Sequence, residues 1–374
     1  MPHLHGPEKK VLALWIYGII IARSCGLSRV AAALASNLGE KEENLRQRLR
    51  EWCWAKADKK GKQRQDWQVQ QSFVPLLRWI LSLWVCEEKR MVLAMDATTL
   101  KQRFVVLSIN VVYRGCAIPI SWVVLREGEK GSWKPYWLAL FSNLQGSIPS
   151  DWLVVVMADR GLYAPWLYEA ITNNGWHPFL RINTGGVYRT NGTADYRPMR
   201  QSLPNPGQVW VGKVTCFRVR SVEATLLACW GEKHKEPWLI LTDIDAEYAR
   251  AAWYGMRCWI ENFYKDIKRD GWQWQKTRMT DPERASRLWL ALAIATLWVV
   301  SVGGEADASL PVSDIDLLPP THVARRNKKN TSRHARFLSC FTRGLIELMT
   351  AFIKHFPVSV GLLYPEPWPL KTYP

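Results

Sequence analysis

The chain has 374 residues, of which 48% are hydrophobic and 22% charged. This balance is typical of a folded globular protein and excludes a disordered one, and the length allows two or three domains. Lys and Arg number 50 against 33 Asp and Glu, which gives a formal net charge of +17. An excess of this size indicates a polyanionic partner, either nucleic acid or an acidic membrane surface.

The eight cysteines are scattered, with no CxxC pair and no Cys/His cluster of zinc spacing. We therefore expect reduced, mostly buried thiols in a cytoplasmic protein. The apolar run Leu288–Val302 is short for a membrane span and favours a buried core helix. The apolar segment Val11–Ala22 lacks the flanks of a signal peptide. We expect a soluble protein with no membrane partner.

The first 88 residues have helical periodicity and are expected to form a DNA-binding region. Residues 27–52 contain two short helical segments separated near Asn37–Gly39, and the second segment is rich in arginine. Such a pair fits either a helix-turn-helix or an ordinary helical hairpin, and its pattern does not separate the two. Residues 56–64 hold five basic side chains and are expected to be an exposed linker.

From residue 90 the pattern changes from helix to strand. Three strands are expected at Met91–Asp96, Phe104–Tyr113 and Cys116–Leu125, the last two joined by a tight turn at Arg114-Gly115. The predicted elements then alternate as a helix (134–144), a strand (151–158), a helix (165–173) and a strand (178–182). This order predicts an α/β fold with a mixed sheet flanked by helices.

Residues 183–235 are punctuated by Gly, Pro and Asn and predict a β-rich insertion with strands at 217–222 and 224–230. The strand Trp238–Thr242 is expected to return to the main sheet, and a long helix is expected to begin at Ala246. Another helix is predicted at 282–302. Residues 306–374 predict a basic helical region for DNA contact or dimerisation, with basic residues concentrated from Arg325 to Arg343.

Three carboxylates stand where a metal site is expected. Asp96 and Asp159 each follow an apolar strand directly, and ligands bind at the carboxyl ends of strands in open α/β sheets. Glu261, from a helix across the same edge, completes the group. Oxygen ligands of this kind suit Mg²⁺ or Mn²⁺, and two such ions about 3.5–4 Å apart can cut a phosphodiester. A strand-end aspartate that only forms a turn is the simpler alternative for each position.

The helix that carries Glu261 presents further charged groups with helical spacing. Tyr254, Arg257, Glu261 and Lys268 follow one another at intervals of three, four and seven residues. This spacing places them along one stripe of a helix. A solvated face with an Arg257–Glu261 pair is the alternative interpretation.

These motifs resemble those of the DDE transposases. Ala94-Met-Asp96-Ala-Thr-Thr-Leu is similar to the first acidic block of that family, and Met157-Ala-Asp159-Arg-Gly-Leu-Tyr to the second. The spacing Y-x2-R-x3-E-x6-K at residues 254–268 resembles the signature of the insertion-sequence-four family of bacterial transposases. The resemblance covers about residues 90–300.

The resemblance implies an RNase H-like catalytic domain made of residues 89–182 and 236–305, interrupted by the insertion. Asp96, Asp159 and Glu261 would bind the metal pair. Arg257 and Lys268, with Tyr254 beside them, would hold DNA phosphates, and Arg160 and Lys265 lie next to the motifs. Family members can use an aromatic residue of the insertion to stack a flipped base, and Trp230 and Trp238 are the candidates here, although both also suit a core.

The implied activity is cut-and-paste DNA transposition in a bacterial cytoplasm, at the nucleoid. The implied partners are the terminal inverted repeats, the target DNA and a second copy of the chain. An RNase H-fold nuclease or resolvase would use the same acids without strand transfer. Two non-catalytic alternatives are a DNA-binding protein derived from a transposase and a basic protein that only binds partners. Neither would need the three acids for its function.

Overall fold

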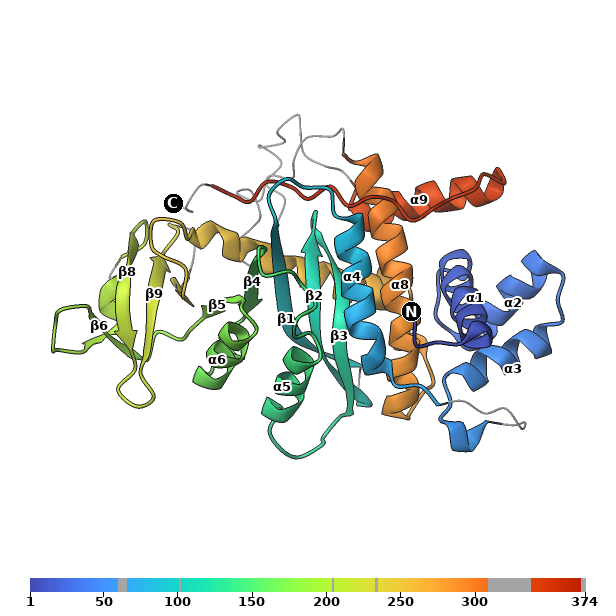
Figure 1. The fold of residues 1–374 in the computed structure, drawn as a ribbon, viewed down its shortest axis with the longest axis horizontal. Coiled ribbons are helices and arrows are strands. Elements are labelled where there is room, and N and C mark those ends of the chain that lie inside the picture. The colour runs from blue at the N-terminus through green and yellow to red at the C-terminus, as the bar shows by residue number, and fades with distance from the viewer. Residues whose placement is uncertain (60–65, 101, 204, 233–234, 309–337, 371–374) are drawn as a thin grey trace.

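The computed structural model describes residues 1–59, 66–100, 102–203, 205–232, 235–308 and 338–370. Within these residues the strands form one sheet in the order β3-β2-β1-β4-β5-β10-β9-β8-β6-β7. Figure 1 shows an elongated molecule with helices α1, α2 and α3 at one end and strands β6, β8 and β9 at the other. The predicted mixed sheet flanked by helices is confirmed.

The first three strands form an antiparallel group. They are β1 (Arg90–Leu100), β2 (Phe104–Tyr113) and β3 (Cys116–Arg126). The predicted tight turn between β2 and β3 is confirmed, because Arg114 and Gly115 both have positive φ, 44° and 80°, as a two-residue hairpin turn requires. The prediction that the first strand ends at Asp96 was wrong. β1 continues to pair with β2 as far as Leu100, so Asp96 lies inside the strand.

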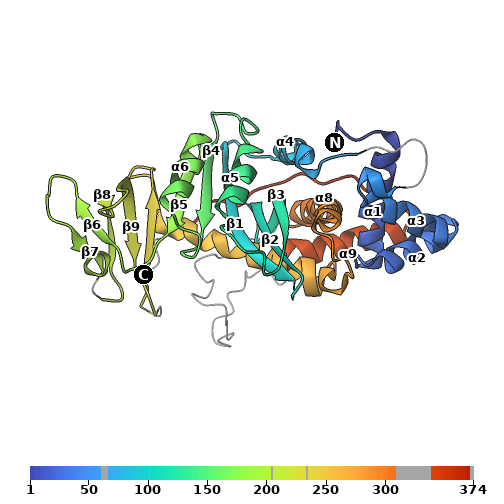
Figure 2. The same cartoon turned by 90° about the horizontal axis from the view of Figure 1, so that it is seen from below.

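Two parallel strands extend the sheet beyond β1. β4 (Leu153–Ala158) pairs with β1, and β5 (His177–Arg181) pairs with β4. Helices α5 (Lys134–Ser142) and α6 (Pro165–Asn173) lie close to the predicted ranges. Figure 2 shows α5 and α6 on one face of the sheet, opposite the helical segment that includes α7.

The insertion continues the same sheet. β10 (Trp238–Thr242) pairs with β5, and β9 (Val222–Cys229), β8 (Val209–Cys216), β6 (Val187–Thr190) and β7 (Arg197–Pro198) follow in that order. The predicted strand at 217–222 was wrong. Phe217 and Arg220 have positive φ, 65° and 53°, so this segment is the turn between β8 and β9.

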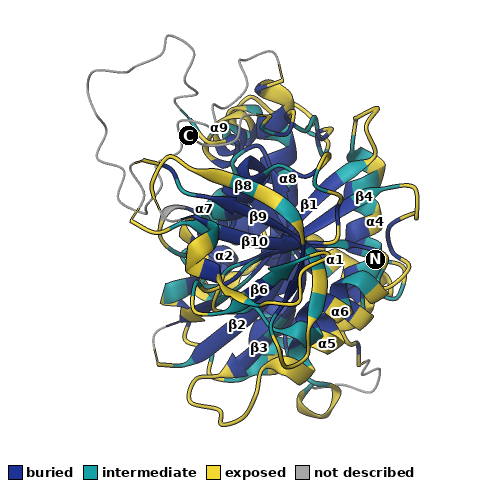
Figure 3. Ribbon diagram, turned by 90° about the vertical axis from the view of Figure 1, so that its left-hand side faces the viewer, coloured by how far each residue is buried: buried dark blue, intermediate teal, exposed yellow. Residues whose placement is uncertain are grey.

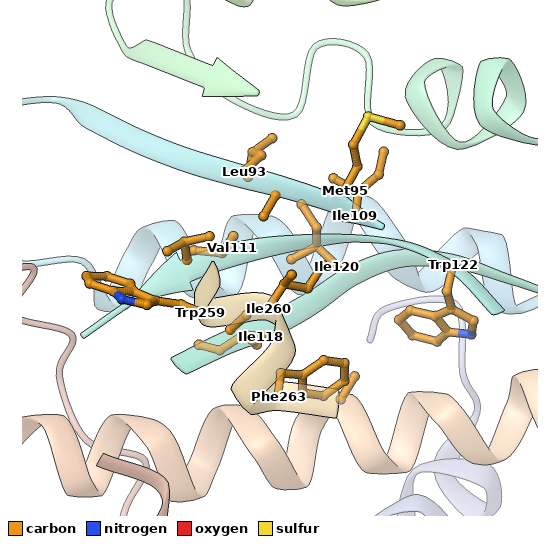
Figure 4. Packing of buried hydrophobic residues seen from close by; sticks show 14 of the residues in the cluster. Leu93, Met95, Ile109, Val111, Ile118, Ile120, Trp122, Trp259, Ile260 and Phe263 are labelled. Carbon is orange, nitrogen blue, oxygen red and sulfur yellow. The ribbon is translucent and has the colours of Figure 1, made fainter. Parts of the chain in front are cut away.

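A helical segment of changing pitch covers the other face. It consists of a 3₁₀-helix η4 (Ala251–Cys258), α7 (Trp259–Lys265) and a π-helical turn η5 (Asp266–Asp270). The predicted start at Ala246 was wrong, because Arg250 is extended, with φ −132° and ψ 125°. Figure 4 shows Trp259, Ile260 and Phe263 of this segment packed toward apolar side chains of β2 and β3. This packing fixes which face of the segment is turned toward the acids of the sheet.

The helix α8 (Pro282–Ala306) forms much of the core, as predicted. The side chain of Asp281 caps its start by accepting a hydrogen bond from the backbone N–H of Arg284. Its length and apolar composition would allow it to cross a membrane, but 89% of its most apolar window is buried inside the protein. α9 (Cys340–Ile353) crosses it closely, since a Cβ on Gly303 would lie 1.8 Å from the carbonyl oxygen of Cys340. Figure 3 shows the central strands buried between their covering helices.

The N-terminal region is helical, as predicted. Its helices are α1 (Gly6–Ala22), α2 (Leu27–Leu38), α3 (Glu42–Trp52) and α4 (Phe73–Leu83), with short 3₁₀ turns at Lys56–Asp58 and Val69–Ser72. Two further 3₁₀ turns lie at Met199–Ser202 and Trp274–Lys276. Part of the predicted basic linker (60–64) and the basic residues Arg325–Arg336 lie outside the described residues. Six of the eight cysteines are buried, and all eight are free thiols.

Candidate active site

Asp96 and Asp159 are neighbours across two parallel strands. Met95 of β1 pairs with Ala158, the last residue of β4. The residues that follow, Asp96 after Met95 and Asp159 after Ala158, are therefore at the same level of the sheet. Side chains at the same level of adjacent strands point to the same face. The sheet register thus brings together two acids that are far apart in the sequence.

Arg257 lies between two of the three predicted acids. Its Nη2 donates to Oδ2 of Asp96 at 2.7 Å, and its Nη1 donates to Oε1 of Glu261 at 3.1 Å. The Arg257 side chain is 11% exposed, and both carboxylate side chains are 24% exposed. Its Nε is buried with no hydrogen-bond partner among the described residues. One guanidinium therefore holds a carboxylate of β1 and a carboxylate of α7.

Tyr254 lies beside the third acid, Asp159. Side chains three residues apart eclipse one another in a 3₁₀-helix, so η4 places Tyr254 directly one turn before Arg257. The Tyr254 hydroxyl donates to the carbonyl oxygen of Ala158 at 3.3 Å and lies 3.5 Å from Oδ1 of Asp159. Tyr254 and Arg257 thus face the ends of β4 and the middle of β1, respectively.

Lys268 lies further along the same strand. Its Nζ donates to Oγ1 of Thr98 at 2.7 Å, and Thr98 is two residues beyond Asp96 on β1. Tyr264, from the next turn of α7, donates from its hydroxyl to the backbone oxygen of Asp96 at 3.0 Å. The segment 254–268 therefore runs along β1 and contacts it at successive residues.

The pKa shifts follow from this crowding. The pKa of Asp96 is raised, chiefly by burial, while Arg257 lowers it and the charges of Asp159 and Glu261 raise it. Burial alone would lower the pKa of Arg257, but Asp96 and the other nearby anionic groups leave it raised. The pKa of Lys268 is lowered by burial and by Arg269. The charges of Asp159 and Glu261 therefore both act on Asp96.

Asp159 has a more open environment than the other two acids. Its side chain is 40% exposed, and Nη1 of Arg181 lies 3.8 Å from its Oδ1. Its Oδ1 also accepts a hydrogen bond from the backbone N–H of Arg160. The Arg160 side chain forms an ion pair with Glu236, which also lies 3.9 Å from Arg181.

The carboxylates of Asp96, Asp159 and Glu261 are chemically suited to bind a hard divalent cation. Its ligands would be carboxylate oxygens only, which Mg²⁺ and Mn²⁺ prefer. Within the described part of the chain, no three His, Cys, Asp or Glu side chains are grouped closely enough to hold a metal ion. Arg257 lies between Asp96 and Glu261 and already neutralises both. A metal ion at these acids would therefore require Arg257 to release them.

The remaining predicted residues lie around this site. Lys265 is exposed on α7. Trp238, half-buried on β10, packs edge-on against Tyr254 with ring centroids 5.2 Å apart. Trp230 is half-buried just after β9. Trp238 is therefore in contact with one of the residues near the acids.

Sequence reasoning missed Arg181, Tyr264 and Thr98. Arg181 ends β5, the strand next to β4, so the argument that united Asp96 and Asp159 at one edge also predicts it. Tyr264 is three residues after Glu261 and belongs to the same helical face. Thr98 was not predictable while the strand was expected to end at Asp96.

Comparison with known protein families decides the class. The model of the transposase DDE domain matches residues 87–298, more than half of the chain. The chain belongs to the transposase DDE domain family. This match spans nearly the same residues as the resemblance carried by the acidic blocks and the tyrosine–lysine spacing.

Other comparisons are weak. No curated protein matches this transposase. Its fold is similar to a piggyBac transposase in a synaptic complex with hairpin DNA, at 9% identity and a TM-score of 0.38, covering 79% of this chain and 74% of the other. Human ENDOV is similar at 11% identity and a TM-score of 0.25, covering 59% of this chain and 94% of the other. Likeness at this level adds no argument about function.

Proposed function

We propose that this transposase cuts DNA at the ends of an insertion sequence and joins those ends to target DNA by a cut-and-paste route. The observation that supports the proposal is that Arg257 pairs with both Asp96 and Glu261, next to the end of β4 where Asp159 follows. The antiparallel strands β1–β3 followed by parallel β4 and β5 support an RNase H-like domain. The segment 254–268 supports membership of the insertion-sequence-four group.

Asp96, Asp159 and Glu261 would hold the divalent ions, Mg²⁺ or Mn²⁺ and two in number. When bound, such ions activate a water or a 3′-hydroxyl and stabilise the oxygen that leaves the phosphodiester. Within the chain itself, Tyr264 holds the backbone of Asp96, and Tyr254 holds the end of β4 next to Asp159. These contacts keep the acids in place before DNA binds.

The basic residues would hold DNA phosphates. Lys268 and Arg257 are already ordered at the site by Thr98 and by the acids, so a phosphate that replaced these contacts would be positioned beside the carboxylates. Lys265 is exposed next to them, and Arg160 would reach DNA after leaving Glu236. Charge-assisted contacts of this kind position DNA without reading its sequence.

Of the two candidates for base stacking, Trp238 is preferred over Trp230. Trp238 packs on Tyr254 and is half-buried, which places its ring beside the site. A flipped base stacked there would remain next to the acids. Loss of hairpin processing, with retained cleavage of the first strand, is the expected result of Trp238→Ala.

The N-terminal and C-terminal regions would bind the DNA and the second copy of the chain. The helices α2 and α3 contact each other, and Arg46 and Arg48 of α3 are exposed. This supports DNA binding by the N-terminal region. Synapsis of two transposon ends implies a homodimer on DNA, and the C-terminal region would supply DNA contact or the dimer interface. The proposed location is the nucleoid of a bacterial cytoplasm.

The decisive experiment uses DNA that carries the ends of the element in which this gene lies. Asp96→Ala, Asp159→Ala and Glu261→Ala should each abolish Mg²⁺-dependent cleavage while leaving DNA binding largely intact. Robust cleavage by any of the three variants would contradict the proposal. A strand-transfer assay with a free 3′-hydroxyl separates a transposase from a nuclease that only hydrolyses DNA.

A further inference from the structure

A C-terminal strap, residues 357–370, returns from α9 across the molecule. Figure 1 shows it passing over the top of α4 and β1 toward the far side of the sheet. It is tied first to α8, because Nε1 of Trp298 donates to the carbonyl oxygen of Ser359 at 3.1 Å. The backbone N–H of Gly361 donates to Oγ of Ser301 at 3.1 Å.

The middle of the strap is anchored on α4 and on the β2–β3 turn. Leu363 is fully buried and exchanges backbone hydrogen bonds with Leu83 and Val85, both at 2.8 Å. The Glu366 side chain is 2% exposed and lies 3.6 Å from Nη2 of Arg114, whose side chain is 5% exposed. A buried ion pair and paired backbone groups indicate a fixed path for this part of the chain.

The strap ends at the segment that carries Tyr254 and Arg257. Trp368 is 6% exposed and packs edge-on against Trp253 of η4, with ring centroids 4.8 Å apart. The guanidinium of Arg90 lies 5.0 Å from the Trp368 ring. On its other side Trp253 contacts Phe179 of β5, with centroids 6.0 Å apart. Trp253 is therefore held between the sheet and the strap.

We propose that Trp368 is a positioning residue, which holds η4 so that Tyr254 and Arg257 reach the acids of the sheet. A 3₁₀-helix has poorer hydrogen-bond geometry than an α-helix and depends more on packing. Trp253 is the residue directly before Tyr254, so movement of its ring moves the Tyr254 backbone. The role in catalysis rests on the proposed function, whereas the role in holding η4 does not.

Hydrogen–deuterium exchange of the full-length protein tests the holding role without DNA. Trp368→Ala should speed amide exchange in residues 251–258 by at least about tenfold, because local opening loses its packing partner. Trp368→Phe, which keeps an aromatic ring, should restore slow exchange. Leu370→Ala is the matched control, since Leu370 is on the same strap and 82% exposed. Unchanged exchange in Trp368→Ala would overturn the proposal, whether or not the protein cleaves DNA.

Cleavage kinetics test the link to the site. Trp368→Ala should lower kcat by about tenfold and leave the Kd for end DNA within about twofold, because Lys268 and the N-terminal helices remain in place. A fall in affinity with unchanged kcat would overturn the positioning role. If Trp368→Ala does not fold, the variants Trp368→Phe and Trp368→Leu replace it, and both amide exchange and kcat should change in steps from wild type to Phe to Leu. Wild-type exchange and kcat in both variants would count equally against the proposal.

Discussion

The two carboxylates bound to Arg257 and the single carboxylate at the end of β4 are held in different ways. Asp96 and Glu261, which with Arg257 form the buried group, have side chains that are 24% exposed and share a guanidinium that is 11% exposed. Asp159 is 40% exposed, and Nη1 of Arg181 lies 3.8 Å from its Oδ1. The buried group is already paired, whereas Asp159 is open to solvent and to an incoming ligand.

This difference has an energetic meaning. Removing one partner of a buried ion pair leaves a charge without compensation and costs about 3–5 kcal/mol. An exposed pair contributes about 0–1 kcal/mol, because water and salt screen it. The ion pairs of Arg257 and the exposed pair of Asp159 should therefore contribute very differently to stability.

The largest expected effect breaks the buried group. Arg257→Met should lower the free energy of unfolding by about 3 kcal/mol, because Asp96 and Glu261 both lose the guanidinium that pairs with them. Asp159→Ala should lower it by less than about 1 kcal/mol. Urea denaturation of the metal-free proteins measures both. Equal losses for the two variants would show that the contrast between the groups has no energetic weight.

The second effect concerns the cation that the buried group holds. Arg257→Met should tighten Mn²⁺ binding by at least about tenfold, because the metal no longer has to displace two charge-assisted hydrogen bonds. Isothermal titration of the DNA-free protein measures the affinity. Arg160→Met is the matched control, since Arg160 pairs with Glu236 rather than with the buried group. Equal Mn²⁺ affinity in wild type and Arg257→Met would mean that the guanidinium does not compete for the acids.

The third effect concerns Tyr254, which lies between the buried group and Asp159. Tyr254→Phe removes the hydroxyl that donates to Ala158 and lies near Asp159. The expected loss is about 1 kcal/mol of unfolding free energy, as for one net hydrogen bond in a buried place. Tyr163→Phe is a suitable control, because its buried hydroxyl has no hydrogen-bond partner among the described residues. A loss in the control as large as in Tyr254→Phe would assign the effect to general packing.

Much of the fold was predictable because local patterns and final structure agree. The hairpin at Arg114-Gly115 and the strand–helix–strand order after residue 150 follow from turn residues and apolar periodicity alone. The strand predicted at 217–222 was wrong because Phe217 and Arg220 are bulky residues that adopt positive φ at a turn. Sequence periodicity carries no signal for that conformation in such residues.

The candidate site was predictable in its members and not in their pairing. Helical spacing placed Tyr254, Arg257, Glu261 and Lys268 on one segment, but it assumed one pitch, and the segment changes from 3₁₀ to α to π. The bridge from Arg257 to Asp96 depends on a tertiary contact between residues 161 positions apart. The Arg257–Glu261 pair, expected only as a solvated alternative, turns out to be part of the same buried group.

The smallest expected effect separates charge from position at Lys268. Burial lowers the pKa of this ammonium below its ordinary value of 10.5. Phosphate binding favours the charged form, so affinity for duplex DNA should weaken as the pH rises through the lowered pKa. Lys268→Arg keeps its charge across that range and should give a flatter profile. Fluorescence anisotropy between about pH 7 and 10 measures both.

Stability should change in the opposite direction over the same range. In the window between the lowered folded pKa of Lys268 and the unfolded value, the unfolded chain binds more protons than the folded one. The free energy of unfolding should therefore rise with pH in wild type relative to Lys268→Arg. Lys268→Ala should also reduce the salt dependence of DNA binding by about one unit of slope. Identical pH profiles for wild type and Lys268→Arg, together with an unchanged slope, would remove Lys268 from the DNA contacts and leave Arg257 as the basic residue at the acids.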